Sequence, residues 1–154
     1  MNEQEQQAYI LGSLLMLANR IQVLGDKLDE KITMKQWLLI AVILKSGQPA
    51  PALSDLAAMI GSSRQNVKKM ALLLEKQGLV ELAKDPQDAR ILRVRLTEGC
   101  MVYFAGRSRE EERFMAELFA DFGKEATTGL FNGLTRLSRN IARMEAGSSD
   151  EEKE

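Results

Sequence analysis

An ordered series of short elements between residues 54 and 96 constrains the fold more than any other feature of the chain. Ser54 is placed to cap a short helix, and Gly61 can take the left-handed conformation that ends one. Either Ser62 or Ser63 then caps a second helix, which has one apolar face. Two helices with a tight turn between them predict a helix-turn-helix.

A two-stranded hairpin is predicted directly after these helices. The second helix should end at Gly78, and residues 79–83 then alternate between apolar and polar types. The turn-prone segment 85–88 leads to residues 91–96, whose apolar side chains also alternate. The predicted fold is therefore mainly α with a small β-hairpin wing, a winged helix-turn-helix.

Two long helical patterns flank this unit, one over about residues 3–27 and one over about residues 124–146. Both repeat apolar residues at alternating steps of four and three, which indicates a helical stripe. Two such stripes exceed what one winged-helix core can cover, which favours dimerisation over packing within one subunit. The residues expected at this dimer interface are Leu14, Leu17, Ile21, Leu134, Leu137 and Ile141.

Capping residues place the remaining helices. Thr33 and Gln36 have the spacing of a capping box, which predicts a helix that ends at Gly47. Thr97 is expected to cap one long helix that reaches about Phe122.

These patterns divide the chain into three parts. Residues 33–96 form the predicted winged helix-turn-helix domain, and residues 1–32 with 97–146 form a helical dimerisation region. Residues 147–154 are acidic and carry no apolar side chain, so a flexible tail is expected there.

Composition argues against several classes of function. The chain has no histidine, which removes the commonest general base and metal ligand, and it has no phosphate-binding loop or nucleophile elbow. We therefore expect no enzyme, no metal and no cofactor. The single cysteine, Cys100, fits a reducing compartment. The longest apolar run, residues 37–44, is too short to cross a bilayer, so a cytoplasmic protein without membrane association is expected.

Charged residues are unevenly distributed along the chain, although its formal net charge at pH 7 is only −1. Residues 62–95 contain eight basic and four acidic side chains, a local charge of +4, which leaves −5 on the remainder. A solvated lysine-rich surface would have the same composition, but here the charge coincides with the helix-turn-helix. We therefore expect double-stranded DNA to be attracted to this part of the molecule.

The second helix of the motif begins with side chains that suit base recognition. The first turns of such a helix reach base edges in the major groove. Arg64 can bind guanine, the amides of Gln65 and Asn66 can bind adenine, and Lys68 and Lys69 suit phosphates.

The hairpin tip is expected to carry a further contact. Arg90 can enter a narrow minor groove, where the negative potential is strongest. Asp88 can bond to Arg90 or to turn amides and so stabilise the wing. The alternative is that Asp88 and Arg90 form only a surface ion pair of little energetic value.

Several segments of the chain together resemble the MarR family of transcriptional regulators. They are residues 53–61, Ser63-Arg64-Gln65-Asn66-Val67, Leu74-Glu75-Lys76-Gln77-Gly78-Leu79-Val80, and Asp85-Pro86-Gln87-Asp88-Ala89-Arg90 leading to Arg95-Leu96-Thr97. The wing pattern Asp-Pro-x-Asp-x-Arg followed by Leu-Thr is the most specific of these. The resemblance follows the helix order over nearly the whole chain.

The resemblance implies a homodimeric regulator that binds a pseudo-palindromic operator, and a repressor that a small apolar or phenolic effector releases. It implies dimerisation through the first, fifth and sixth helices. It assigns minor-groove binding to Arg90, and recognition to Ser63, Arg64, Gln65, Asn66, Lys68 and Lys69.

Two departures from the family pattern bear on function. Leu72-Leu73 stands where the family usually has an acidic and a basic residue, which leaves open a winged-helix protein-interaction module without sequence-specific DNA binding. Cys100 does not match the N-terminal position of the reactive cysteine in oxidation-sensing relatives, so a buried, inert thiol is expected.

A small-molecule effector would need a cavity with apolar walls. Met16, Met34, Trp37 and Met101 are candidates to line a cavity, although apolar residues at helical spacing more often belong to a core.

Overall fold

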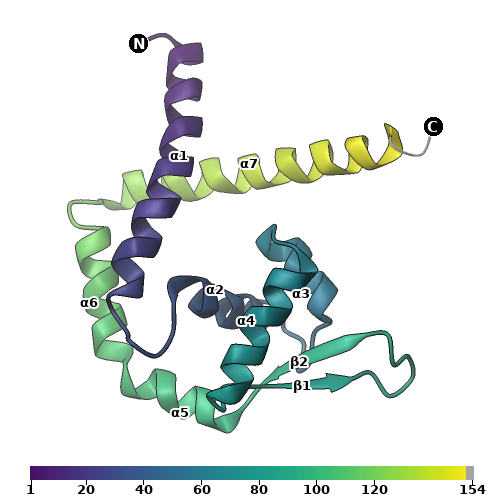
Figure 1. Cartoon of the computed structure of the whole chain (residues 1–154). Helices are drawn as coiled ribbons and strands as arrows, with labels where there is room; N and C mark the ends of the chain where they lie inside the picture. Colours follow the sequence, from purple (N-terminus) through teal and green to yellow (C-terminus); the bar gives the residue numbers. More distant parts are fainter. Residues whose placement is uncertain (152–154) are drawn as a thin grey trace. The chain divides into compact units, whose positions relative to one another are not determined.

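The computed structural model describes residues 1–151 and is mostly helical over that range, with one antiparallel hairpin (Figure 1). This confirms the predicted winged-helix fold class. The elements are, in order, α1 (Glu3–Asp26), α2 (Met34–Lys45), α3 (Leu53–Ile60), α4 (Arg64–Lys76), β1 (Val80–Lys84), β2 (Leu92–Leu96), α5 (Glu98–Gly106), α6 (Ser108–Leu118) and α7 (Lys124–Glu151). The chain forms two compact units that divide within α6, after Glu110.

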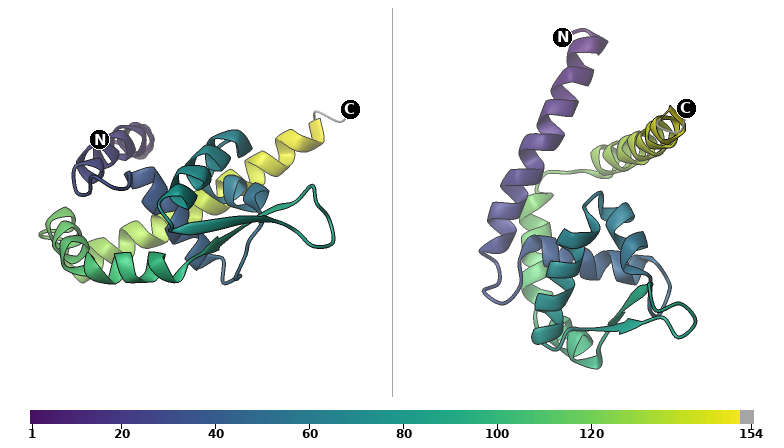
Figure 2. Two further views of the ribbon diagram at one scale, coloured as in Figure 1. Left: turned by 60° about the horizontal axis from the view of Figure 1, so that its bottom comes forward. Right: turned by 45° about the vertical axis from the view of Figure 1, so that its right-hand side comes forward.

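The core of the first unit lies between α2, α3, α4 and the hairpin. Its largest fully buried side chains are Leu39, Leu53, Leu56, Val67, Leu74, Val80, Val94 and Cys100. Burial of each such leucine or valine contributes about 1.5–3 kcal/mol relative to exposure. The hairpin is anchored through Val80 and Val94, and its tip extends away from α2, α3 and α4 in both views of Figure 2.

Several predicted caps are confirmed. Thr33 and Gln36 form the capping box of α2, with Gln36 N donating to Thr33 Oγ1 at 3.2 Å and Thr33 N donating to Gln36 Oε1 at 2.9 Å. Ser63 accepts from Asn66 N at the start of α4, and Thr97 accepts from Cys100 N at the start of α5. Gly61 has φ +75°, the left-handed conformation that ends α3.

The prediction that Ser54 caps α3 is wrong. Ala52 holds the N-cap position without a side-chain hydrogen bond, and the helix begins at Leu53. Ala52 pairs with Arg93 in an isolated β-bridge, and Val94 N donates to the carbonyl of Pro51 at 3.0 Å. This pairing keeps residue 52 extended, so the helix begins one residue before Ser54.

The single helix predicted from Thr97 to Phe122 is also wrong, because the chain breaks it at Arg107. Arg107 has φ −114° and ψ 11°, outside the helical range, and separates α5 from α6. The break follows Gly106, a weak helix former, and the Arg107 side chain is held by Asp29.

The last helix extends further than expected. α7 continues through Glu151, so residues 147–151 are helical, whereas the sequence predicts a flexible tail from residue 147. The rest of that predicted tail, residues 152–154, lies outside the described residues.

Most side chains of the two apolar stripes are exposed. Leu14 and Leu17 on α1 are exposed and Ile21 is half-buried, while Leu134, Leu137 and Ile141 on α7 are exposed. By length and composition alone, α1 could span a membrane. Only 6% of the 18-residue apolar stretch that meets this criterion is buried. The uninterrupted run at residues 37–44 gave no sign of this, because the apolar residues of α1 are interspersed with polar ones.

Candidate nucleic-acid interface

One side of α4 is buried and the other is exposed. Val67, Ala71 and Leu74 are fully buried against the core, because they recur at helical spacing. The side chains expected at the recognition surface are all exposed, namely Ser63, Arg64, Gln65, Asn66, Lys68 and Lys69. The N-terminal half of α4 thus presents two side-chain amide groups and three cations to solvent.

Lys68 and Lys69 form no ion pair with any residue that the structure describes. Their charge is therefore not neutralised within residues 1–151. An anionic backbone placed against α4 would meet two ammonium groups that need not leave an intramolecular partner.

The wing is a regular hairpin with an ordered tip. β1 and β2 pair antiparallel, from Val80 opposite Leu96 to Lys84 opposite Leu92. Asp85 closes the tip, since its Oδ2 accepts from Gln87 N and Asp88 N at 3.0 Å each. These bonds make the tip a defined structure in place of a loose loop.

The base of the wing is tied to the loop before α3 through Arg93. Arg93 Nε donates to Asp85 Oδ1 at 2.6 Å, and its Nη1 donates to the carbonyl of Ala50 at 3.1 Å. In the sequence, Arg93 is predicted only as part of the basic charge. Its spacing from Asp85 across the predicted hairpin is the signal that identifies the pair.

The Asp88 carboxylate accepts hydrogen bonds from both the main chain and the guanidinium of Arg90. Asp88 Oδ1 accepts from the main-chain N and Nε of Arg90, and Oδ2 accepts from Nη2, each at 3.0 Å. The Arg90 side chain is nevertheless 90% exposed. The pair is solvent-exposed and so weakly held, which leaves Arg90 able to exchange this partner for a DNA acceptor.

The wing tip also contacts the start of α4. Arg64 Nη2 donates to the carbonyl of Arg90 at 3.3 Å. The structure therefore brings together Arg64 and Arg90, which are 26 residues apart in the chain.

The wing carboxylates titrate below their ordinary range. The hydrogen bond from Arg93 lowers the pKa of Asp85 most, followed by the amides of Asp88 and Gln87. Arg90 likewise lowers the pKa of Asp88, and Asp88 raises the pKa of Arg90. Each effect arises because the hydrogen bonds favour the charged form.

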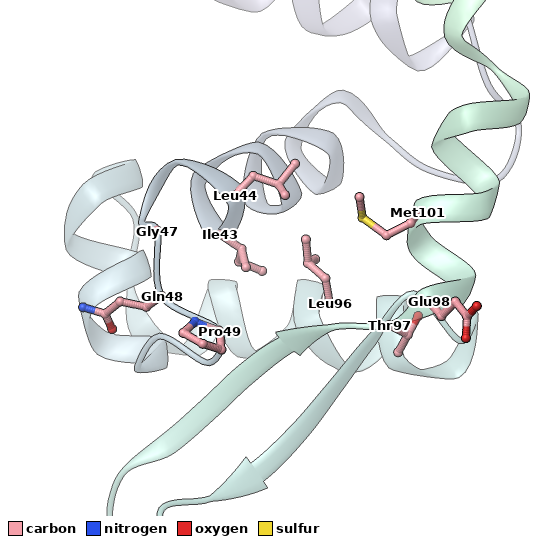
Figure 3. Close-up of a pocket in the computed structure, with 9 residues that line it drawn as sticks. All are labelled: Ile43, Leu44, Gly47, Gln48, Pro49, Leu96, Thr97, Glu98 and Met101. Carbon is pink, nitrogen blue, oxygen red and sulfur yellow. The ribbon is translucent and has the colours of Figure 1, made fainter.

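A pocket of about 470 Å³ lies between the end of α2 and the start of α5 (Figure 3). The side chains of Ile43, Leu44, Leu96 and Met101 line it, with Gln48 and Glu98 among the polar residues. Of the four effector-site candidates, only Met101 is found here.

The other three candidates lie elsewhere. Met16 is exposed on α1, and Trp37 packs against the core. Met34 packs against Gly25, where an added β-carbon would overlap its Cε.

Two other sequence features can now be placed. Leu72 and Leu73 are 42% and 51% exposed on α4. Cys100 is buried, as predicted, and burial raises the pKa of its thiol, which keeps it protonated and unreactive. Within the described residues no group of three acidic or cysteine side chains could hold a metal ion.

The chain is similar in sequence to known transcriptional regulators. A sequence model of the MarR family matches residues 31–91. The chain is 30% identical over 125 residues to the "uncharacterized HTH-type transcriptional regulator YdgJ" of Bacillus subtilis, covering 81% of this chain and 76% of that protein.

Solved structures show the same fold. A MarR/EmrR family transcriptional regulator from Acinetobacter sp. ADP1 matches with a TM-score of 0.74 and 19% identity, over 89% of this chain and 97% of that one. The PcaV transcriptional regulator from Streptomyces coelicolor, solved in complex with its natural ligand, matches with a TM-score of 0.66 and 20% identity, over 80% of this chain and 89% of that one.

The lowered pKa values predict an acid limit for the ordered wing tip. Asp85 and Asp88 have folded-state pKa values below 3.8, so their contribution to stability is present above pH 3.8 and is lost as the pH falls through the lower folded values. In an NMR titration from pH 7, the amide signals of Gln87 and Arg90 should shift with midpoints below pH 3.8. In Asp85→Asn the acid response of Gln87 should disappear, and a wild-type midpoint above pH 3.8 would contradict the assignment.

Proposed function

The chain belongs to the MarR family of transcriptional regulators, and from that premise we propose that it is a cytoplasmic homodimeric repressor that a small-molecule effector releases from its operator. Members of the family are DNA-binding regulators and not enzymes. The observation that carries the proposal is the exposed N-terminal half of α4, where Lys68 and Lys69 have no ion-pair partner among the described residues.

Within this proposal, α4 enters the major groove and the wing enters the neighbouring minor groove. Arg64, Gln65 and Asn66 read base edges because they lie on the first turn of α4. Ser63, Lys68 and Lys69 bind phosphates and fix the orientation. Arg90 enters the minor groove after exchanging Asp88 for base or sugar acceptors.

Dimerisation is supported by the apolar surface that the single chain leaves exposed. Leu14 and Leu17 lie on a helix of 24 residues whose only buried residue is Gly25. A second copy of the chain would remove this surface from water, as would a membrane. We favour the second copy because a two-fold dimer presents two α4 helices to a palindromic site.

Effector release is supported by the pocket beside Met101. Its volume of about 470 Å³ lies within the usual range of small-molecule sites, and its lining is mostly apolar. PcaV was solved with its natural ligand bound, so a protein of this fold accommodates one. A phenolic compound that binds better to a DNA-incompetent arrangement would shift the population away from the operator.

The DNA contact of the wing can be tested with Arg90→Ala. We expect operator affinity to fall by about 5- to 150-fold and the salt dependence of binding to weaken by about one counterion. The operator would first be selected with the wild-type protein from a random duplex pool. Arg139→Ala, which removes an exposed arginine of α7, serves as the control and should leave affinity unchanged.

Normal DNA binding by Arg90→Ala would refute the assignment of the wing to the minor groove. If the wild-type protein selects no duplex, a protein partner at Leu72-Leu73 is favoured instead.

The dimer interface can be tested with Leu17→Glu. A charge on the exposed stripe should convert the dimer to monomer in analytical ultracentrifugation while circular dichroism keeps its helical signal. Asn19→Glu places the same charge on the opposite side of α1 and should remain dimeric. A dimeric Leu17→Glu protein would place the interface elsewhere.

The effector site can be tested with Met101→Trp, which fills the pocket. A panel of phenols would be screened for release of the wild-type protein from its selected DNA. For any active compound, Met101→Trp should bind DNA normally and resist release at least about tenfold. Met115→Trp alters an exposed methionine of α6 and should respond as the wild type does. Equal release of both variants would exclude this pocket.

A further inference from the structure

The winged domain, with α5 packed on its core, joins α1 and α6 through two short connections. One is the loop of residues 27–33, which leads from α1 into α2. The other is Arg107, the residue at which the chain passes from α5 to α6. Within one subunit, a change in the position of α4 relative to α1 or to the start of α6 must alter one or both of these connections.

The structure links the two connections through a shielded ion pair. Arg107 Nη1 donates to Asp29 Oδ2 at 2.8 Å, and the Tyr103 hydroxyl donates to the same oxygen. Asp29 Oδ1 accepts from Lys31 N at 2.7 Å. The side chains of Arg107 and Asp29 are only 13% and 17% exposed, so both charges are largely removed from water.

Aromatic rings complete the surroundings of this pair. The Lys31 ammonium lies 5.0 Å from the centre of the Tyr103 ring, and the Arg107 guanidinium lies 5.7 Å from it. Arg107 also lies 5.2 Å from the centre of the Phe104 ring. Cations at these distances from an aromatic face are attracted to it, so the rings restrict where Arg107 can move.

The same loop contacts the end of the recognition helix. Gln77, the C-cap residue of α4, donates through Nε2 to the carbonyl of Lys31 at 2.6 Å. Arg107, Asp29, Lys31 and Gln77 therefore form a continuous set of bonds from the α5–α6 break to α4. We call these residues, with Tyr103, the Asp29 clasp.

We propose that the Asp29 clasp is the joint that fixes α4 relative to α1 and to the start of α6, and so helps to set the spacing between the two recognition helices. The inference rests on the proposed function, because spacing has meaning only in a DNA-bound dimer. Asp29, Gln77 and Arg107 are positioning residues that need not touch DNA.

The chemistry of the clasp suits a joint better than a simple source of stability. A shielded ion pair gains little over an apolar replacement of the same volume, but removal of one partner leaves an uncompensated charge. Such a pair therefore favours one geometry strongly over its neighbours. The cap of α4 is held to it by a directional hydrogen bond.

The test uses the full-length protein and the palindromic duplex that the wild type selects. Inserting or deleting one base pair between half-sites shifts them by about 3.4 Å and rotates them, so the wild type should lose about tenfold or more in affinity. Asp29→Asn, which removes the charge, should reduce this discrimination to about threefold or less. Gln77→Met, which cuts the link to α4 and leaves the ion pair in place, should do the same.

The control and the double variant separate positioning from loss of folding. Glu30→Gln neutralises the exposed neighbouring carboxylate and should keep wild-type discrimination. The two clasp changes combined should have less than the product of their separate effects, because both interrupt one set of bonds. A uniform loss of affinity at every spacing, or unchanged discrimination, would overturn the clasp alone. Failure of the wild type to select any two-fold site would overturn the proposed function and, with it, the clasp.

Discussion

The burial of one face of α4 is the constraint on which the rest of the interface depends. Val67, Ala71 and Leu74 have no exposed surface, and they recur at the period of a helix. With that face fixed in the core, Gln65, Lys68 and Lys69 can only face solvent. The exposed face of α4, the proposed recognition surface, is thus a geometric consequence of the core. A substitution that turned α4 about its axis would displace these side chains together.

Formal charge overstates the cationic character of the wing. Arg90 is bound by Asp88, Arg93 by Asp85, and Arg95 by Glu81. The three pairs give order to the hairpin, and they leave the unpaired charge concentrated on α4. Affinity for a phosphate backbone is therefore expected to come mainly from Lys68 and Lys69, while Arg90 must exchange one partner for another.

The exposed stripes on α1 and α7 are apolar surface that the first unit's core does not bury. α1 has only one buried residue among its 24, so its stability must come from something beyond the first unit's core. The proposed dimer would supply that cover and would also place two copies of α4 on one duplex. Stability and function would then depend on the same interface, with the Asp29 clasp between it and α4.

The sequence by itself determined the elements that rest on local chemistry. The capping box at Thr33 and Gln36, the left-handed Gly61, the apolar face of α4 and the hairpin all follow from side chains a few residues apart. The tertiary structure decided what depends on distant partners: the start of α3, set by the bridge from Ala52 to Arg93, and the break at Arg107, held by Asp29 across 78 residues. Periodicity and capping describe a chain only over neighbouring turns. Long-range pairs form because folding brings those groups together, so they leave no pattern in the sequence.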